Sequence, residues 1–165
     1  MASDDLALLL QQTIERELPH LRSLSEVAAA LKPAGKTSWS PKEELGHLID
    51  SAANNHQRFV RAALEPEYRG PGYAQEAWVS LNGYRETPWT EVVLTWYQYN
   101  RLLVRTMGNI PRNKLDTPCF IGSAQEPETL GFIIGDYVLH MQHHIDHLLG
   151  REQVTPYPSQ AKTAL

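Results

Sequence analysis

The sequence has little of what marks secreted or membrane proteins. It contains a single cysteine, Cys119, among 165 residues, so no disulfide can form within the chain and we expect a reducing, cytoplasmic location. No apolar run approaches the ~20 residues of a membrane-spanning helix. The acidic start of the chain, MASDD, lacks the basic residues of a secretory signal. A membrane is therefore not an expected partner.

Positive charge is also scarce. The 15 lysines and arginines are outnumbered by 19 aspartates and glutamates, which gives a net charge of −4. The basic residues do not cluster into the stripe that binding to a phosphate backbone needs. Nucleic acid is therefore not an expected partner either.

The length and composition predict one globular domain. A chain of 165 residues with 42% hydrophobic and 21% charged residues is typical of a single folded domain with one core. We expect this domain to occupy residues 1–165, with residues 155–165, TPYPSQAKTAL, as a tail.

Helical periodicity begins near the N-terminus. Ser3 is placed to cap a helix whose apolar residues recur at helical spacing from Leu6 to Ile14. Pro19 is expected to break or kink this helix. A second, short helix is predicted over about residues 25–31.

The clearest helix start lies at Ser40. This residue is a favoured N-cap, Pro41 suits the first helical position, and Glu43 completes a capping box with Ser40. An apolar stripe continues to about residue 64. The segment therefore predicts a helix long enough to span a bundle.

Two more long helices follow, separated by long connections. The periodicity predicts helices over about residues 88–107 and 128–150, the second ending at a C-cap glycine. The connection at 65–87 is rich in Gly, Pro and Tyr and contains one short helix, AQEAWVSL, and the connection after residue 107 has room for a small hairpin. Four long helices, two long crossings and no alternating strand pattern predict an all-α four-helix bundle.

Four of the seven histidines fall in one run of the last helix, LHMQHHIDHLLG. His140 and His144 lie on the flank of the apolar stripe and are four residues apart, the spacing by which a helix presents two imidazoles to one metal ion. His143 and His147 have the same spacing but point further towards solvent. The alternative is that His140 and His144 are half-buried histidines satisfied by water or by neighbouring helices. The apolar stripe itself consists of Leu130, Ile134, Tyr137, Met141, Ile145 and Leu148.

A zinc or nickel site needs at least a third protein ligand, which must come from another helix. The candidates are His20, His47 and His56. His20 follows Pro19 at the expected break, and His56 lies on an apolar stripe, where a packed core histidine is the commoner outcome. On a helical wheel His47 falls nearly opposite the apolar stripe of its helix, which counts against it. Small residues beside His47 nevertheless leave room for neighbouring helices.

A carboxylate-bridged pair of metals is the main rival to a single ion. The spacing Glu44-x-x-His47 matches one ligand element of such bundles. The last helix lacks the second copy, because it has no glutamate between Glu128 and Glu152. Two metals are therefore disfavoured. Haem with histidine ligands stays open, although nothing marks an attachment site.

Two motifs in this order resemble those of the DinB/YfiT-like superfamily of metal-dependent four-helix-bundle enzymes. They are WSPKEELGHLIDS from Trp39 and HMQHHIDH from His140, and the segment GYAQEAWVSLNGY between them resembles the superfamily's aromatic-rich connection. The resemblance extends to about Gly150. It implies a bundle of the DinB/YfiT-like type in which His47, His140 and His144 bind one divalent metal, usually zinc or nickel. It also implies a homodimer.

The chain departs from its nearest relatives at two positions beside these motifs. Gly46 and Leu139 stand where a second histidine and a tryptophan are common. The difference concerns the surroundings of the ligands more than the ligands themselves. His143 and His147 are interpreted as solvated surface histidines in preference to partners of the ligands.

The resemblance implies an enzyme that acts on a small molecule, either by S-transfer with a low-molecular-weight thiol or by hydrolysis. Asp50 is a candidate base for both reactions, and a carboxylate on the helix surface or beside the ligands is an equal interpretation. Cys119 is interpreted as an ordinary loop cysteine. Tyr73, Trp78 and Tyr84 either line a substrate pocket or simply pack. The alternative function is a non-catalytic bundle that binds a metal or senses a ligand.

Overall fold

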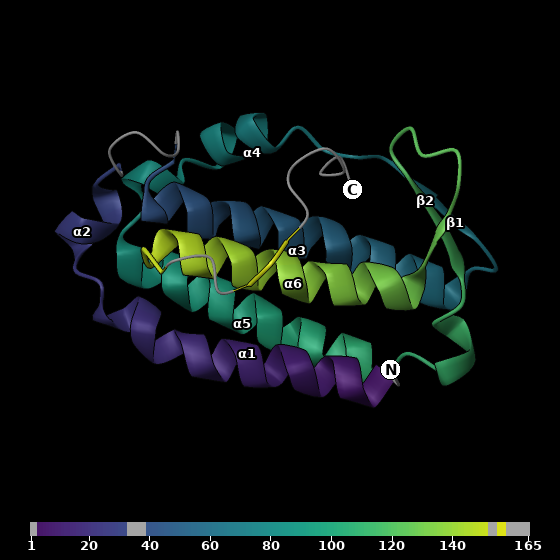
Figure 1. Ribbon diagram of the computed structural model, residues 1–165. Helices are drawn as coiled ribbons and strands as arrows, with labels where there is room; N and C mark the ends of the chain where they lie inside the picture. Colours follow the sequence, from purple (N-terminus) through teal and green to yellow (C-terminus); the bar gives the residue numbers. More distant parts are fainter. Residues whose placement is uncertain (1–2, 33–38, 152–154, 158–165) are drawn as a thin grey trace.

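Four long helices form the body of the protein. The structure, a computed structural model, describes residues 3–32, 39–151 and 155–157, so most of the predicted tail lies outside the described residues. The long helices pack side by side (Figure 1). They are α1 (Ser3–Ser23), α3 (Pro41–Leu64), α5 (Trp89–Gly108) and α6 (Leu130–Leu148). The predicted all-α four-helix bundle is confirmed.

Shorter elements occupy the connections between these helices. Both α4 and the turn η1 belong to the connection between α3 and α5, and both pack against α3. Figure 1 shows α4 outside the bundle, on the side of α3. These elements are α2 (Glu26–Ala30), α4 (Gln75–Asn82) and the two 3-10 turns η1 (Tyr84–Glu86) and η2 (Arg112–Lys114).

Side-chain caps fix the start of α3, as predicted. The Ser40 hydroxyl accepts from the backbone N–H of Glu43, and the Glu43 carboxylate accepts from the backbone N–H of Ser40 at 2.8 Å. At the last helix, the hydroxyl of Thr129 accepts from the backbone N–H of Phe132 at 3.2 Å. Gly150 follows that helix with a φ of 66°, a left-handed conformation that glycine adopts without strain.

Of the break or kink expected at Pro19, the break does not occur, because α1 continues to Ser23. Proline lacks the N–H that would bond to the carbonyl one turn earlier, so the local sequence favours an end there. Packing against α5 offsets this cost. Leu21 is fully buried, and the indole N–H of Trp89 donates to its carbonyl at 2.9 Å. Tertiary contacts therefore carry the helix past the proline.

A small sheet joins the two long connections. The strand β1 (Tyr68–Gly70) pairs in parallel with β2 (Pro118–Ile121), which pairs antiparallel with β3 (Glu128–Thr129). The sequence suggested a hairpin in the second connection but gave no sign of β1 or of the parallel pairing. Strands of two to four residues carry too little alternation to be recognised, and the parallel pair joins segments about 50 residues apart.

The core lies between the four long helices. The six predicted stripe residues of α6 are all buried, with exposed fractions of 0 to 7%. In the part of the chain that the structure describes, no helix combines the length and the apolar character that a membrane crossing requires.

Candidate metal centre

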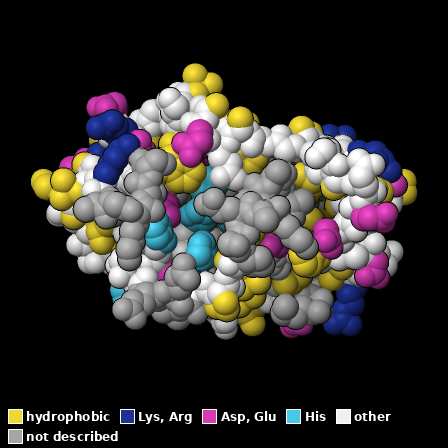
Figure 2. Space-filling view, turned by 45° about the horizontal axis from the view of Figure 1, so that its top comes forward, with side chains coloured by type: hydrophobic (Ala, Val, Ile, Leu, Met, Phe, Trp, Pro, Cys, Tyr) yellow, Lys and Arg dark blue, Asp and Glu magenta, His cyan; other side chains and the backbone are white. Residues whose placement is uncertain are grey.

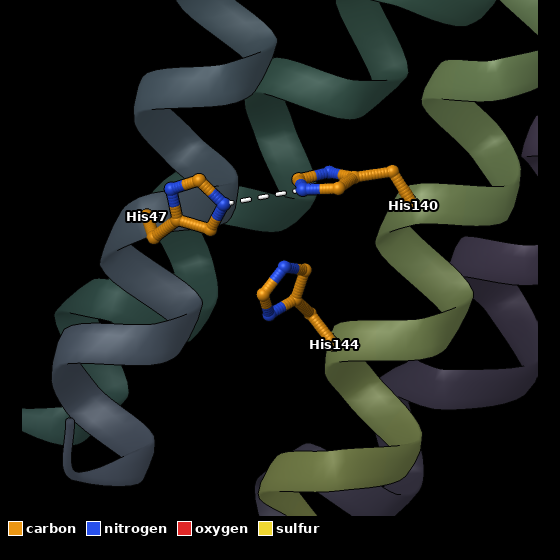
Figure 3. A group of neighbouring side chains, drawn as sticks. All are labelled: His47, His140 and His144. Atoms are coloured by element: carbon orange, nitrogen blue, oxygen red, sulfur yellow. Dashed lines mark hydrogen bonds between the residues drawn. The ribbon is translucent and has the colours of Figure 1, made fainter. Parts of the chain in front are cut away.

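The bundle brings three histidines from two helices together. His47 of α3 meets His140 and His144 of α6, and each ring offers a nitrogen that lies within 4.8 Å of those of the other two. The Nε2 atoms of His47 and His140 are 3.3 Å apart. Figure 3 shows the three rings pointing toward one another from the two helices. The group is the one that resemblance to the family implied.

The burial of His47 differs from what the helical wheel suggested. Its side chain is fully buried, although it lies nearly opposite the apolar stripe of α3. The wheel assumed that this side of the helix faces solvent. Instead α6 packs on it, and the ring of Trp39 lies 5.0 Å from the imidazole, centroid to centroid. The start of α3 is enclosed on nearly all sides, so wheel position did not indicate exposure.

Burial keeps the imidazoles in the form that binds metals. It lowers the pKa of His47 to about 3, with a smaller contribution from the charge of His144. Burial also lowers the pKa of His140 well below its usual range, and the neighbouring histidines add to this effect. Both rings are therefore neutral at physiological pH, and a neutral imidazole is the form of histidine that coordinates a metal.

Glu44 holds the third ring in place. Its buried carboxylate accepts from Nδ1–H of His144 at 2.9 Å and from Nδ1–H of His147 at 2.7 Å. Because Nδ1 of His144 is occupied, its Nε2 atom is the nitrogen that faces His47 and His140. A carboxylate that fixes the far nitrogen of a ligand in this way is a common feature of histidine metal sites. The donor set therefore fits a divalent metal.

This role of Glu44 was not recognised from the sequence. Glu44 was considered only as a ligand of a two-metal site. The relevant signal was the spacing Glu44-x-x-His47, which places both side chains on one face of α3. His147 was expected to be solvated, and its side chain is 38% exposed, yet it binds Glu44 as well. His143 lies outside the group, with Nδ1 3.5 Å from the carbonyl of Thr155.

The other candidate ligands lie elsewhere. His20 is exposed near the end of α1. His56 is partly buried, with Nδ1 3.4 Å from the hydroxyl of Tyr99. Within residues 3–32, 39–151 and 155–157, the three-histidine group is the only cluster of potential ligands found, which gives no support to a second metal.

Asp50 lies one turn after His47 in a separate polar cluster. Its Oδ1 atom accepts from the hydroxyl of Tyr84 and from the amide of Asn82, both at 2.7 Å. Its Oδ2 atom is buried without a partner among the described residues. Burial raises the pKa of Asp50, and the two hydrogen bonds oppose that shift. The arrangement suits a fixed carboxylate, and the role of Asp50 as a base stays a prediction.

The position of Tyr84 depends on Gly46. A Cβ atom added at Gly46 would lie 2.1 Å from Cδ2 of Tyr84. The tyrosine ring therefore packs directly against the backbone of α3, in space that any larger residue would fill. The absence of a side chain at Gly46 thus explains how Tyr84 reaches Asp50.

A pocket opens beside His140 between α3 and α6. Its walls carry mainly polar side chains, including Tyr73, whose ring also contacts Trp78 at 5.5 Å between centroids. The space-filling view shows histidine side chains reaching the surface in the middle of this face (Figure 2). Of the three histidines, His140 lines this pocket, whose volume of about 20 Å³ has room for about one water. Cys119 lies in strand β2 and not in a loop as expected. It is buried, and burial raises the pKa of its thiol to about 11, which agrees with an unreactive cysteine.

Comparisons with known proteins identify the family and the fold. A sequence model of the DinB superfamily matches residues 9–148. Among solved structures, the chain resembles YfiT from Bacillus subtilis, described as "a probable metal-dependent hydrolase with an unusual four-helix bundle topology". The similarity covers 90% of this chain and 84% of that one, with 19% sequence identity and a TM-score of 0.76, and it shows the fold alone. None of the curated proteins compared with the chain matches it.

Proposed function

The chain belongs to the DinB superfamily, and on that premise we propose that it is a mononuclear divalent-metal enzyme that acts on a small molecule by thiol S-transfer or hydrolysis. The observation that carries the proposal is the convergence of His47, His140 and His144, of which His140 lines a small pocket. A closed structural zinc site has four protein ligands, whereas three leave a position for a reactant. A homodimer and a cytoplasmic location remain predictions.

We assign the metal ligands to His47 from α3 and to His140 and His144 from α6. An all-imidazole set suits zinc or nickel better than magnesium or calcium, which prefer oxygen ligands. When bound, such an ion supplies a water whose pKa is lowered to roughly 7, or holds a thiol as thiolate. The low-molecular-weight thiol is part of the proposal for the transferase reaction.

The protein's own groups would then orient the site and move protons. Glu44 fixes the ring of His144 through Nδ1, and His147 shares that carboxylate. Asp50 is the proposed base, held by Tyr84 and Asn82.

The variant Asp50→Asn tests the role of Asp50 as a base. The protein should keep its metal content while kcat falls. An unchanged kcat would show that Asp50 takes no part in the reaction.

The enzymatic proposal is tested by screening. Metal-loaded protein would be incubated with a panel of electrophiles plus bacillithiol, mycothiol or glutathione, and separately with ester and amide substrates. Turnover above that of metal-free protein supports the proposal. Full metal loading with no turnover in any arm would favour the second function, a non-catalytic bundle that binds a metal or senses a ligand.

Glu44→Gln should weaken metal binding without abolishing it. The glutamine keeps the shape of the side chain but loses the charge that accepts from two imidazoles. Loss of such a partner typically costs ~10- to 100-fold in affinity, and we expect about tenfold here because one acceptor oxygen remains. Competition with a chromogenic chelator measures the change.

The matched control for this change is Glu91→Gln. Glu91 is an exposed residue in the first turn of α5, away from the histidines. Its replacement should leave the affinity unchanged. Equal affinities for wild type and Glu44→Gln would show that Glu44 does not support the ligand.

A further inference from the structure

A buried arginine lies on the same face of α3 as His47. The residues His47, Ser51, Asn55 and Arg58 follow one another at intervals of four, four and three, which keeps them on one side of the helix. All four are buried, and Arg58 is only 3% exposed. This row of polar side chains begins at the three-histidine group and ends at a guanidinium.

The charge of Arg58 has no acidic partner in the part of the chain that the structure describes. Its Nη1 donates to Oδ1 of Asn55 and its Nη2 to the carbonyl of Pro71, both at 3.4 Å. Both acceptors are neutral, and both distances exceed the usual range for charge-assisted hydrogen bonds. By contrast, the buried carboxylate of Glu17 pairs with Arg151 at 2.9 Å. A buried arginine is rarely left without a counter-charge.

Hydroxyl and thiol groups also surround Arg58. The side chain of Tyr68 hydrogen-bonds with its guanidinium, and the phenol of Tyr73 and the thiol of Cys119 lie nearby. Burial raises the pKa of Tyr73 to about 12 and that of Cys119 to about 11, so neither supplies a negative charge at physiological pH. Burial lowers the pKa of Arg58, but a guanidinium remains protonated at any pH at which proteins fold.

Arg58 and His140 line the same pocket. The walls between them are formed by Ser51 and Asn55 of α3, Tyr137 of α6 and Tyr73 of the connection before α4. The pocket is lined by one carboxyl group, Asp136, which accepts from the hydroxyl of Tyr157 at 3.1 Å and does not act on Arg58 among the described residues. Arg58 and His140, one of the three histidines, thus line one cavity, whose volume of about 20 Å³ has room for about one water. A larger group enters it only when lining side chains move apart.

We propose that Arg58 binds an oxyanion, a carboxylate or phosphate carried by the small molecule whose reacting atom lies at the three-histidine group. The position of the reacting atom rests on the proposed function, whereas the binding of an oxyanion by Arg58 does not. A guanidinium binds either oxyanion with two parallel hydrogen bonds, and a buried one does so with little competition from water. Arg58 begins about 16 Å along α3 from His47, at ~1.5 Å per residue, so the ligand is an extended molecule with its anion at one end.

The test is a titration of the wild-type protein with inorganic phosphate and, separately, with succinate. The readout is the Nε–H resonance of Arg58 in ¹H–¹⁵N spectra, identified as the signal missing from Arg58→Lys. We expect this resonance to shift with at least one of the anions at millimolar concentrations, in both metal-free and metal-loaded protein. A larger response to phosphate indicates a phosphorylated ligand, and a larger response to succinate a carboxylic acid.

Two variants complete the experiment. Arg58→Gln should bind the preferred anion at least about tenfold more weakly, the loss expected for one charge-assisted contact. The matched control is Arg61→Gln on the same helix, whose side chain is half exposed and already paired with Glu65. It should bind as the wild type does. Circular dichroism establishes that each variant is folded.

The outcomes separate this inference from the proposed function. If the Arg58 resonance does not move at tens of millimolar of either anion in a protein that carries its metal, the inference is wrong and the metal site stands. If the resonance moves in a protein that binds no metal, the metal site is wrong and the anion subsite stands. Equal affinities in wild type and Arg58→Gln would also overturn the inference.

Discussion

The purified wild-type protein is expected to carry about one divalent ion per chain, and His47→Ala and His140→Ala are each expected to lose it. Each change removes one of three imidazoles that converge within 4.8 Å. Changes to the partners of a metal ligand cost up to ~100-fold in affinity, and removal of a ligand itself should cost more. Elemental analysis of the dialysed proteins measures the occupancy.

A matched control comes from the same helix. His143 is adjacent to a proposed ligand in sequence but lies outside the group, so His143→Ala should keep full occupancy. Thermal unfolding gives a second measurement, because an ion present at about 100 times its dissociation constant adds about 2.7 kcal/mol to the free energy of unfolding. His47→Ala and His140→Ala should show no such metal-dependent gain. Full occupancy in both would show that the ion is bound elsewhere.

The sequence predicted features whose causes are local. The capping box of Ser40 and Glu43 lies within four residues and forms as expected. The apolar stripe of α6 predicted which side of that helix is buried, and the spacing of His140 and His144 placed two rings together. The capping groups and the two histidines are at most one turn apart, and the stripe repeats at the period of the helix, so helical geometry alone relates these residues.

Features that depend on distant contacts could not be derived in this way. The helical wheel argued against His47 because it describes one helix, whereas α6 and the aromatic ring of Trp39 decide the environment of that residue. The resemblance to a family supplied His47 because it carries information about the assembled bundle. Glu44 was assigned no supporting role, since its partners His144 and His147 lie about 100 residues away in the chain.

The same reasoning applies to the short sheet and to Pro19. The pairing of β1 with β2 and the contact of Trp89 with α1 both join segments far apart in sequence. Local propensity gave a hairpin in one place and a helix break in another. Tertiary packing added the parallel strand β1 to the hairpin and carried α1 past Pro19. Tertiary contacts commonly override local propensity in this way.

Gly46→Ala should destabilise the fold by about 2 kcal/mol, because overpacking a closely packed site costs ~1–3 kcal/mol and alanine returns up to ~1 kcal/mol of helix propensity. The cost is expected at the upper end, since the new Cβ would lie 2.1 Å from an atom in the ring of Tyr84 rather than beside a flexible chain end. Urea unfolding at constant metal concentration measures the change.

Without the ring of Tyr84, Gly46→Ala should raise the free energy of unfolding instead of lowering it. In a Tyr84→Ala background the space beside residue 46 is open, and Gly46→Ala should then stabilise the protein by up to about 1 kcal/mol, the ordinary gain of alanine over glycine inside a helix. Tyr84→Ala alone leaves Asn82 as a donor to Asp50, so the carboxylate keeps one partner. If Gly46→Ala were equally destabilising with and without the ring, the glycine would be required for another contact. A reversal would establish that Gly46 is what allows Tyr84 to hold Asp50 one turn from the three-histidine group.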